Sequence, residues 1–144
     1  MDIVKIQTDL LKDILNKKSK KWFISISSDS VTLGSSYQLW IINKDDFILD
    51  TTILIHNGVN VISPKKLLGD FESAEPLAKT NIKRITTDGT CIELKLKDDH
   101  IYVNEKFLKY YDKDAEFKAI TVNSLVYVYE AGLLVGAVLP VKVV

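Results

Sequence analysis

The chain has 144 residues, of which 47% are hydrophobic and 26% are charged, so it is long enough to bury a core as one domain. Its 19 basic and 19 acidic residues cancel, which excludes a global positive field of the kind that favours nucleic-acid binding. Arg84 is the single arginine, and lysines suit diffuse contacts with phosphates better than bidentate reading of bases. Any binding of nucleic acid would therefore use a local lysine patch and would not read sequence.

The cysteine content and the hydropathy of the sequence indicate the cellular compartment in which the protein is expected. Cys91 is the single cysteine, so no disulfide can form within the chain. We find no signal peptide and no apolar run near the roughly twenty residues that span a bilayer. These features predict a cytoplasmic protein with no membrane partner.

The N-terminal part of the chain is predicted to form a strand, a helix and then several strands. Residues 3–6 are rich in β-branched side chains, which predicts a strand, and Thr8 follows as a candidate N-cap. The helix is expected to continue to about Lys18. Its predicted buried side chains are Leu10, Leu11, Ile14 and Leu15. Turn residues then separate short strands, predicted at residues 22–27, 31–34, 37–42 and 47–55.

The clearest start of a helix lies in the middle of the chain. Asn57-Gly58 suits a tight turn, and residues 59–62 are strand-like. Ser63-Pro64 then supplies an N-cap and a proline at the first helical position. A helix over residues 65–71 should follow.

The second half of the chain is predicted to be rich in strands. After a loop at residues 72–80, Asp88-Gly89 predicts the turn of a hairpin. Asn104 is a candidate cap for a short helix that buries Phe107, Leu108 and Tyr111. The predicted strands of this half are residues 82–87, 90–96, 101–103, 117–122, 125–129 and 133–139.

One pattern occurs three times: a strand, a capping residue, and a helix with two bulky apolar residues at the end of its first turn. The copies read VKIQTDLLKDIL, VNVISPKKLLGDF and IYVNEKFLKYYD. Antiparallel strand signals follow each copy, which favours an α+β fold of repeated β-α-β-strand units over a doubly wound fold. We expect a single domain, residues 1–144, with two to three short helices and units at about 3–55, 58–97 and 100–144.

Three segments, IYVNEKFLKYYD, AGLLVGAVLPVKV and GVNVISPKKLLGDF, carry a resemblance to a known family. They are similar to the last helix with its preceding strand, the closing strand, and a strand-to-helix segment of the DNA sliding clamp family, bacterial DNA polymerase III β-subunit type. The resemblance implies a sliding-clamp-like domain. Bacterial clamps carry three domains per chain and this chain holds about one, so a ring would need several copies in a homo-oligomer.

The resemblance also implies a function: a non-enzymatic DNA-replication accessory protein that binds duplex DNA without sequence preference. Clamp helices present lysines to the phosphate backbone. The matching candidates here are Lys12, Lys17, Lys18, Lys20, Lys21, Lys65, Lys66, Lys106 and Lys109. Neighbouring acidic residues such as Asp9 and Asp13 cancel much of this field, and only residues 12–21 remain strongly positive. A replication protein or polymerase is the implied partner, and the lysine-rich, arginine-poor composition favours a phage or mobile-element origin.

Two other interpretations stay open at this point. The lysines of residues 17–21 also suit a solvated helix end that complements the helix dipole. Alternatively, the protein is an interaction module that binds a host or phage replication protein without contacting DNA. A groove for such a partner could use Tyr127, Tyr129, Leu133 and Val135, although core packing is the simpler role for these residues and for Trp22 and Trp40.

An enzyme is the least favoured class, and we expect no catalytic residues, cofactor or metal. The sequence has no phosphate-binding glycine loop, no HExxH, no CxxC pair and no nucleophile elbow. Asp98-Asp99-His100 resembles a solvated turn more than a metal site, and His56 lies far from it in sequence. Cys91 alternates with apolar neighbours, which predicts a small buried side chain.

Overall fold

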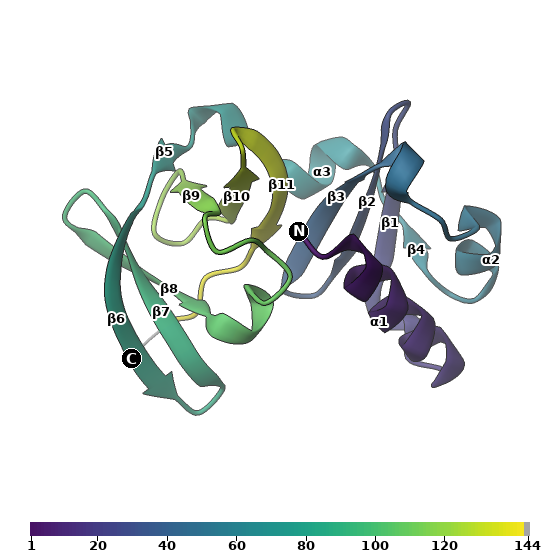
Figure 1. The fold of residues 1–144 in the computed structure, drawn as a ribbon, viewed down its shortest axis with the longest axis horizontal. Helices are drawn as coiled ribbons and strands as arrows, with labels where there is room; N and C mark the ends of the chain where they lie inside the picture. Colours follow the sequence, from purple (N-terminus) through teal and green to yellow (C-terminus); the bar gives the residue numbers. More distant parts are fainter. Residues whose placement is uncertain (143–144) are drawn as a thin grey trace.

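The computed structural model describes residues 1–142, apart from the side chains of residues 64 and 65. Within that range the fold is α+β, with three α-helices and eleven strands (Figure 1). The α-helices are α1 (Ile3–Leu15), α2 (Thr51–His56) and α3 (Pro64–Leu68). The 3-10 helices are η1 (Ser19–Lys21), η2 (Lys44–Asp46), η3 (Phe71–Ser73) and η4 (Glu105–Phe107).

The strands form two sheets. The order across the larger sheet is β4 (Asn60–Val61), β1 (Phe23–Ile26), β2 (Ser30–Ser35), β3 (Gln38–Asn43), β11 (Leu133–Val138), β10 (Val126–Glu130), β9 (Glu116–Ala119) and β5 (Glu75–Pro76). The smaller sheet contains β6 (Ala78–Thr86), β7 (Gly89–Leu96) and β8 (Asp99–Asn104). Neighbouring strands are antiparallel except β1 and β4, which confirms the predicted class with mostly antiparallel sheets.

The larger sheet is continuous because β3 pairs with β11, the last strand in the chain. Trp40 lies opposite Gly136, and Leu39 lies opposite Ala137. A Cβ atom at Gly136 would lie 2.5 Å from the Leu39 carbonyl oxygen and closer still to the Tyr111 hydroxyl. Glycine is therefore required where these two strands meet.

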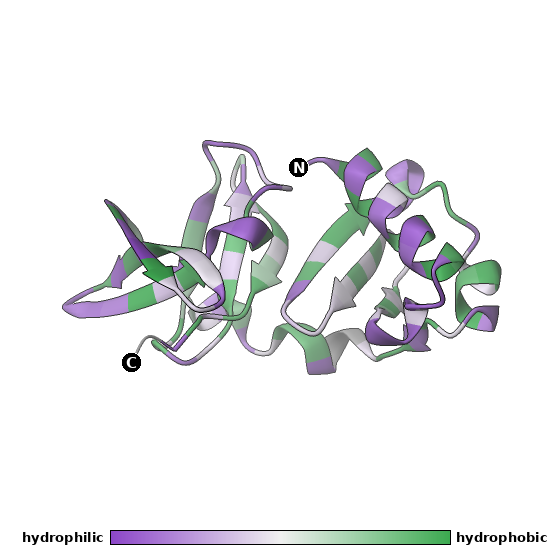
Figure 2. Cartoon of the chain, turned by 90° about the horizontal axis from the view of Figure 1, so that it is seen from below, coloured by the Kyte–Doolittle hydropathy of each residue, from purple (hydrophilic) through white to green (hydrophobic). Residues whose placement is uncertain are grey.

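Three hydrophobic clusters hold the layers together. Ile6 and Leu10 of α1 pack on one face of β1–β3 in the first cluster, together with Trp40. Leu67 and Leu68 of α3 pack on the opposite face, so the two helices lie on opposite sides of these strands (Figure 1, Figure 2). The third cluster joins the smaller sheet to β9–β11.

Residues 3–6 are the first turn of α1, so the strand predicted there is wrong. Asp2, not Thr8, caps the helix, because its side chain accepts a 3.0 Å hydrogen bond from the Lys5 amide. The Thr8 hydroxyl instead donates to the Val4 carbonyl inside the helix. The buried residues Ile6 and Leu10 are four apart, and this helical spacing overrides the strand propensity of β-branched residues.

The buried face of α1 also differs from the prediction. Leu10 is fully buried and Ile14 partly buried, but Leu11 is 44% exposed and Leu15 is 81% exposed. The buried face runs through Ile6, Leu10 and Ile14, which are four residues apart, and this spacing leaves Leu11 and Leu15 on the outer side of the helix.

The strand predicted at residues 47–55 is wrong as well. This stretch forms a loop and then α2, which Asp50 caps by accepting hydrogen bonds from the Thr52 and Ile53 amides. Gln7 anchors the loop to α1, since its carboxamide donates to the Asp46 carbonyl and accepts from the Ile48 amide. A tertiary contact thus sets the conformation of a segment with strong strand propensity.

The predicted start of α3, the hairpin and the Asn104 cap agree more closely with the structure. Ser63 is at the N-cap position and Pro64 is the first residue of α3, but the Ser63 side chain forms no capping hydrogen bond, and the helix ends at Leu68 and not at residue 71. The predicted hairpin of β6 and β7 is confirmed, but its turn is Thr87-Asp88, because Gly89 already pairs with Thr86 as the first residue of β7. Strand β6 extends into the stretch predicted as loop. Asn104 accepts a hydrogen bond from the Lys106 amide as predicted, but it caps only the short η4.

Over the described residues, no helix combines the length and apolarity that crossing a bilayer requires.

Candidate nucleic-acid interface

Five of the predicted lysines gather at the C-terminal end of α1. Lys12 lies on the helix, Lys17 follows it with a left-handed φ of 57°, and Lys18 and Lys20 lie in the turn that ends the helix. Lys21 completes the group, and all five side chains are exposed. Among the described residues only Lys21 of this group forms an ion pair, with Asp13 at 3.2 Å. The other four cations are therefore available to an external anion.

Two further lysines reach the same region from the distant η4 segment. The Lys106 ammonium lies 5.0 Å from the centre of the Phe107 ring, and the Lys109 ammonium lies 5.0 Å from the centre of the Tyr110 ring. Phe107 and Tyr110 line a pocket that Lys12 and Lys21 also line. The fold therefore brings Lys12 and Lys21 close to the segment that carries Lys106 and Lys109.

The predicted lysines of α3 do not join them. Lys66 is exposed on α3, which packs on the opposite face of the sheet from α1. The side chain of Lys65 lies outside the described part of the structure. One continuous surface of all nine predicted lysines is therefore not formed, because the sheet separates α3 from α1.

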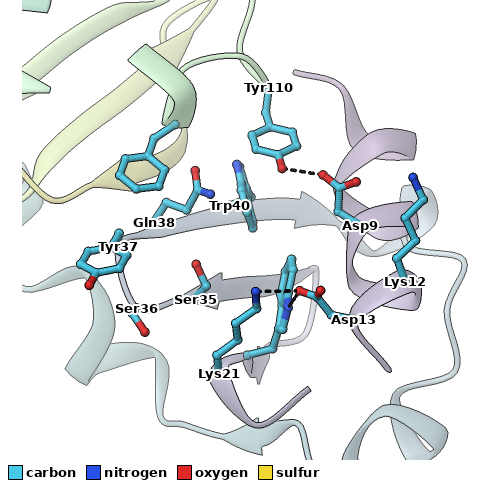
Figure 3. A pocket seen from close by; sticks show the side chains of 12 residues that line it. Asp9, Lys12, Asp13, Lys21, Ser35, Ser36, Tyr37, Gln38, Trp40 and Tyr110 are labelled. Atoms are coloured by element: carbon cyan, nitrogen blue, oxygen red, sulfur yellow. Dashed lines mark hydrogen bonds and ion pairs between the residues drawn. The ribbon is translucent and has the colours of Figure 1, made fainter. Parts of the chain in front are cut away.

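The pocket between α1 and η4, hereafter the aromatic pocket, has a volume of about 380 Å³ (Figure 3). Helix α1 contributes Asp9, Lys12 and Asp13, and the turn from β2 to β3 contributes polar side chains such as Ser36 and Gln38. Its full lining is Asp9, Lys12, Asp13, Lys21, Trp22, Ser35, Ser36, Tyr37, Gln38, Trp40, Phe107 and Tyr110. A volume of this size matches the lower range of small-molecule sites.

Packed aromatic rings form the floor and one rim of the aromatic pocket. The rings of Trp22 and Trp40 lie 5.7 Å apart, and Tyr110 meets Trp40 edge-on at 4.9 Å. Both tryptophans are buried, which agrees with the core-packing role predicted for them. Tyr37 is 59% exposed at the rim, and its ring stacks on Phe107 at 5.8 Å with an interplanar angle of 19°.

Two carboxylates of α1 face the aromatic pocket, and each has a partner. Asp13 accepts from the Trp22 indole at 2.7 Å and from Lys21. Burial acts to raise the pKa of Asp13, but these two hydrogen bonds outweigh it and hold the pKa below its ordinary value. Asp9 accepts from the Tyr110 hydroxyl at 2.5 Å, and burial together with this bond raises the pKa of Tyr110. The tyrosine is therefore a neutral donor at physiological pH.

The charged side chains that line the aromatic pocket balance, because Lys12 and Lys21 accompany the carboxylates of Asp9 and Asp13. Three more lysines lie within 6.0 Å of the centre of an aromatic ring that lines the pocket. Lys5 and Lys109 lie near the Tyr110 ring, and Lys106 lies near the Phe107 ring. These three cations add positive charge beside the pocket.

The groove proposed from Tyr127, Tyr129, Leu133 and Val135 is not formed by these residues together. Tyr127 is buried against α3 and donates a hydrogen bond to the Leu68 carbonyl, whereas Val135 packs in the cluster under the smaller sheet. The side chains thus lie on opposite faces of the larger sheet, and Leu133 is exposed. The core interpretation holds for Tyr127.

The other titratable candidates are dispersed. His56 is exposed at the end of α2, while His100 pairs with Glu93 at 3.1 Å and not with Asp98 or Asp99. Burial acts to raise the pKa of Glu93, but hydrogen bonds from Tyr102 and His100 hold it below its ordinary value. Cys91 is fully buried, as predicted. Across residues 1–142, no three His, Cys, Asp or Glu side chains are placed to hold a metal ion.

Sequence reasoning missed Lys5, Tyr37, Gln38 and Tyr110 as parts of one site. Lys5 was assigned to a strand, although the four-residue spacing of Ile6 and Leu10 already indicated a helix. Tyr37 and Gln38 lie about 70 residues before Tyr110, and no local pattern in the sequence predicts that these two segments meet. Comparison of the chain with protein-family models, with curated proteins and with solved structures finds no match.

Proposed function

We propose that this protein is a non-enzymatic accessory protein of DNA replication that binds nucleic acid through lysines, without reading its sequence. The observation that carries the proposal is that Lys12 and Lys21 meet, at the aromatic pocket, the segment that carries Lys106 and Lys109. Lysines contact phosphates as flexible point charges, which suits binding that is independent of sequence.

The salt dependence of binding follows from the number of cations. Seven predicted lysines lie within residues 12–21 and 106–109, and each duplex phosphate contact adds about −0.9 to the slope of log K against log salt concentration. The slope should therefore not exceed about −5 in size, because ion pairing of Lys21 with Asp13 leaves six lysines in the count.

A clamp-like mode of action rests on the sequence resemblance alone and requires several copies. We propose a homo-oligomer that encircles duplex DNA, with a polymerase or another replication protein as its partner. Light scattering at low salt would measure the assembly, and retention on closed circular against linear DNA would test encirclement. A ring retained only on circles supports this mode, and a monomer that dissociates equally from both DNAs contradicts it.

The lysine interface is tested by charge reversal. Lys12, Lys17, Lys18 and Lys20 would be changed together to Glu, leaving Lys21 intact because it is paired with Asp13. A matched variant reverses four lysines elsewhere that form no ion pair among the described residues: Lys44, Lys66, Lys95 and Lys142. We expect the first variant to lose binding of a 30-base-pair duplex and the second to retain most of it. Equal losses would show that net charge, and not this interface, determines binding.

A second candidate function is a protein-interaction module that does not contact DNA. The outer face of α1 supports it, because Val4 is 72% exposed and Leu11 and Leu15 are also exposed, in a row along the helix. A replication protein could pack against this row. Under this candidate the original protein binds no duplex DNA, and changing Leu11 and Leu15 to Ser would abolish its capture of a purified replication protein. Capture that survives this change would remove the support for the second candidate.

A further inference from the structure

Two buried polar atoms beside the aromatic pocket have no hydrogen-bond partner among the described residues. They are Oε1 of Gln38 and Nε1 of Trp40, and both side chains line the pocket. Buried polar groups are nearly always paired in folded proteins, so unpaired ones call for an explanation. Gln38 and Trp40 are two apart on β3, which places both side chains on the face that α1 covers.

This pair offers complementary hydrogen-bonding groups. The indole Nε1 of Trp40 can only donate, and the carboxamide of Gln38 offers both a donor and an acceptor whichever way it is turned. Figure 3 shows the carboxamide beside the indole. Both unpaired atoms are covered in this structure, so the half-buried Gln38 side chain must turn outward before a ligand can reach them.

The remaining walls are a flat aromatic surface and the charged wall of α1, where Asp9 and Asp13 are bonded to Tyr110, Trp22 and Lys21 and Lys12 is the cation left unpaired among the described residues. Tyr37 and Phe107 present stacked rings at the rim, and Tyr37 is largely exposed. Lys12 lines another part of the same pocket and has no ion-pair partner within residues 1–142. A ligand that fits must therefore have a planar ring with donors and acceptors on its edge, and an anionic group nearby.

A nucleotide with an unpaired base has this chemistry. Unpaired bases stack on aromatic side chains and form hydrogen bonds through their Watson–Crick edges, whereas a duplex hides those edges. We propose that the aromatic pocket binds one nucleotide of single-stranded nucleic acid, with the base on Tyr37 and Gln38 and the phosphate at Lys12. This inference rests on the proposed function and adds to it a preference for single strands over duplex.

Tryptophan fluorescence gives a direct readout. The chain has two tryptophans, Trp22 and Trp40, and both line the aromatic pocket, so emission from the intact protein reports on its occupancy. Titrations would use an eight-residue thymidine oligonucleotide, a hairpin duplex with the same number of phosphates, and thymidine monophosphate. We expect the oligonucleotide to change the emission and to bind at least about tenfold more tightly than the duplex.

Variants of the rim and floor make the test specific. Tyr37→Ala and Gln38→Leu should each weaken oligonucleotide binding by about tenfold and leave duplex binding unchanged, because only an unpaired base reaches these side chains. Tyr37→Phe keeps the aromatic ring and should bind like the original protein. Thermal melting of each variant establishes that it is folded before affinities are compared.

The outcomes separate this inference from the proposed function. Equal binding of oligonucleotide and duplex, unaffected by Tyr37→Ala, would overturn the nucleotide site and leave the lysine interface standing. Failure to bind any nucleic acid at low salt would overturn both. Thymidine monophosphate that binds as tightly as the oligonucleotide would support the site and identify a free nucleotide as its ligand.

Discussion

The hydroxyl of Tyr110 donates a 2.5 Å hydrogen bond to the carboxylate of Asp9, and these residues are 101 positions apart in the sequence. This bond joins the first helix to the segment after η4, and the aromatic pocket lies between them (Figure 3). The main-chain amide of Asp2 strengthens the same junction by donating to the Tyr110 carbonyl at 2.7 Å. The site therefore depends on contacts that form only when the first helix and the segment around Tyr110 have folded together.

Changing Tyr110 to Phe should destabilise the protein by about 1–3 kcal/mol, because it removes a hydrogen bond to an ionised carboxylate and leaves Asp9 without this donor. Urea unfolding would measure the loss. Tyr37→Phe is the matched control, since Tyr37 is exposed and its hydroxyl forms no hydrogen bond with the described residues. Equal stabilities of the two variants would contradict the role of the Tyr110 bond.

The lowered pKa of Asp13 predicts a pH dependence of stability. A carboxylate whose pKa is lower in the folded state stabilises the fold above its unfolded value of 3.8, and this contribution is lost as the pH falls below that value. The free energy of unfolding should therefore decline less between pH 5 and pH 2 in Asp13→Asn than in the original protein. Identical profiles for the two proteins would argue against this assignment.

The two faces of α1 predict opposite responses to truncation of leucine. Leu10→Ala should cost about 2–5 kcal/mol of unfolding free energy, because the side chain is fully buried in the core. Leu15→Ala should change stability by less than about 0.5 kcal/mol, because most of that side chain is already in water. Chemical denaturation of both variants measures the difference. A large loss on truncating Leu15 would favour the helical face predicted from the sequence.

Gly136→Ala should destabilise the junction between β3 and β11 by about 1–3 kcal/mol, since the new methyl group would meet the Leu39 carbonyl and the Tyr111 hydroxyl. Tyr111→Phe removes one of these obstacles, so the two changes should be less than additive in a double-mutant cycle. Strict additivity would show that the Tyr111 hydroxyl does not oppose the methyl group.

Local signals in the sequence predicted the elements that local chemistry determines. Pro64 starts α3, the Asp88-Gly89 pair marks the turn of a hairpin to within one residue, and Asn104 caps η4. Each of these signals acts on the backbone within a few residues. The same kind of reasoning failed at residues 3–6 and 47–55. There, burial against the sheet and the hydrogen bonds of Gln7 override strand propensity.

The candidate site was predictable only in part. The lysines of residues 12–21 stood out as a cluster in the sequence, and the structure leaves most of them unpaired among the described residues. Lys12 and Lys21 line the aromatic pocket together with Phe107 and Tyr110 only because of tertiary packing. No pattern within a single sequence predicts that contact. The separation of Lys66 from the others has the same cause, because the strands between α1 and α3 place the two helices on opposite faces.

The central place of β11 in the larger sheet has a consequence for synthesis of the protein. Strands β1–β3 leave the ribosome early, but the edge of β3 has no partner until Leu133–Val138 has been made. Closing that gap requires a loop of roughly ninety residues, so folding should be slow and governed by non-local contacts. During translation, the open edge of β3 is the part of the nascent chain most exposed to wrong pairing, and a chaperone that covers it would protect the whole sheet.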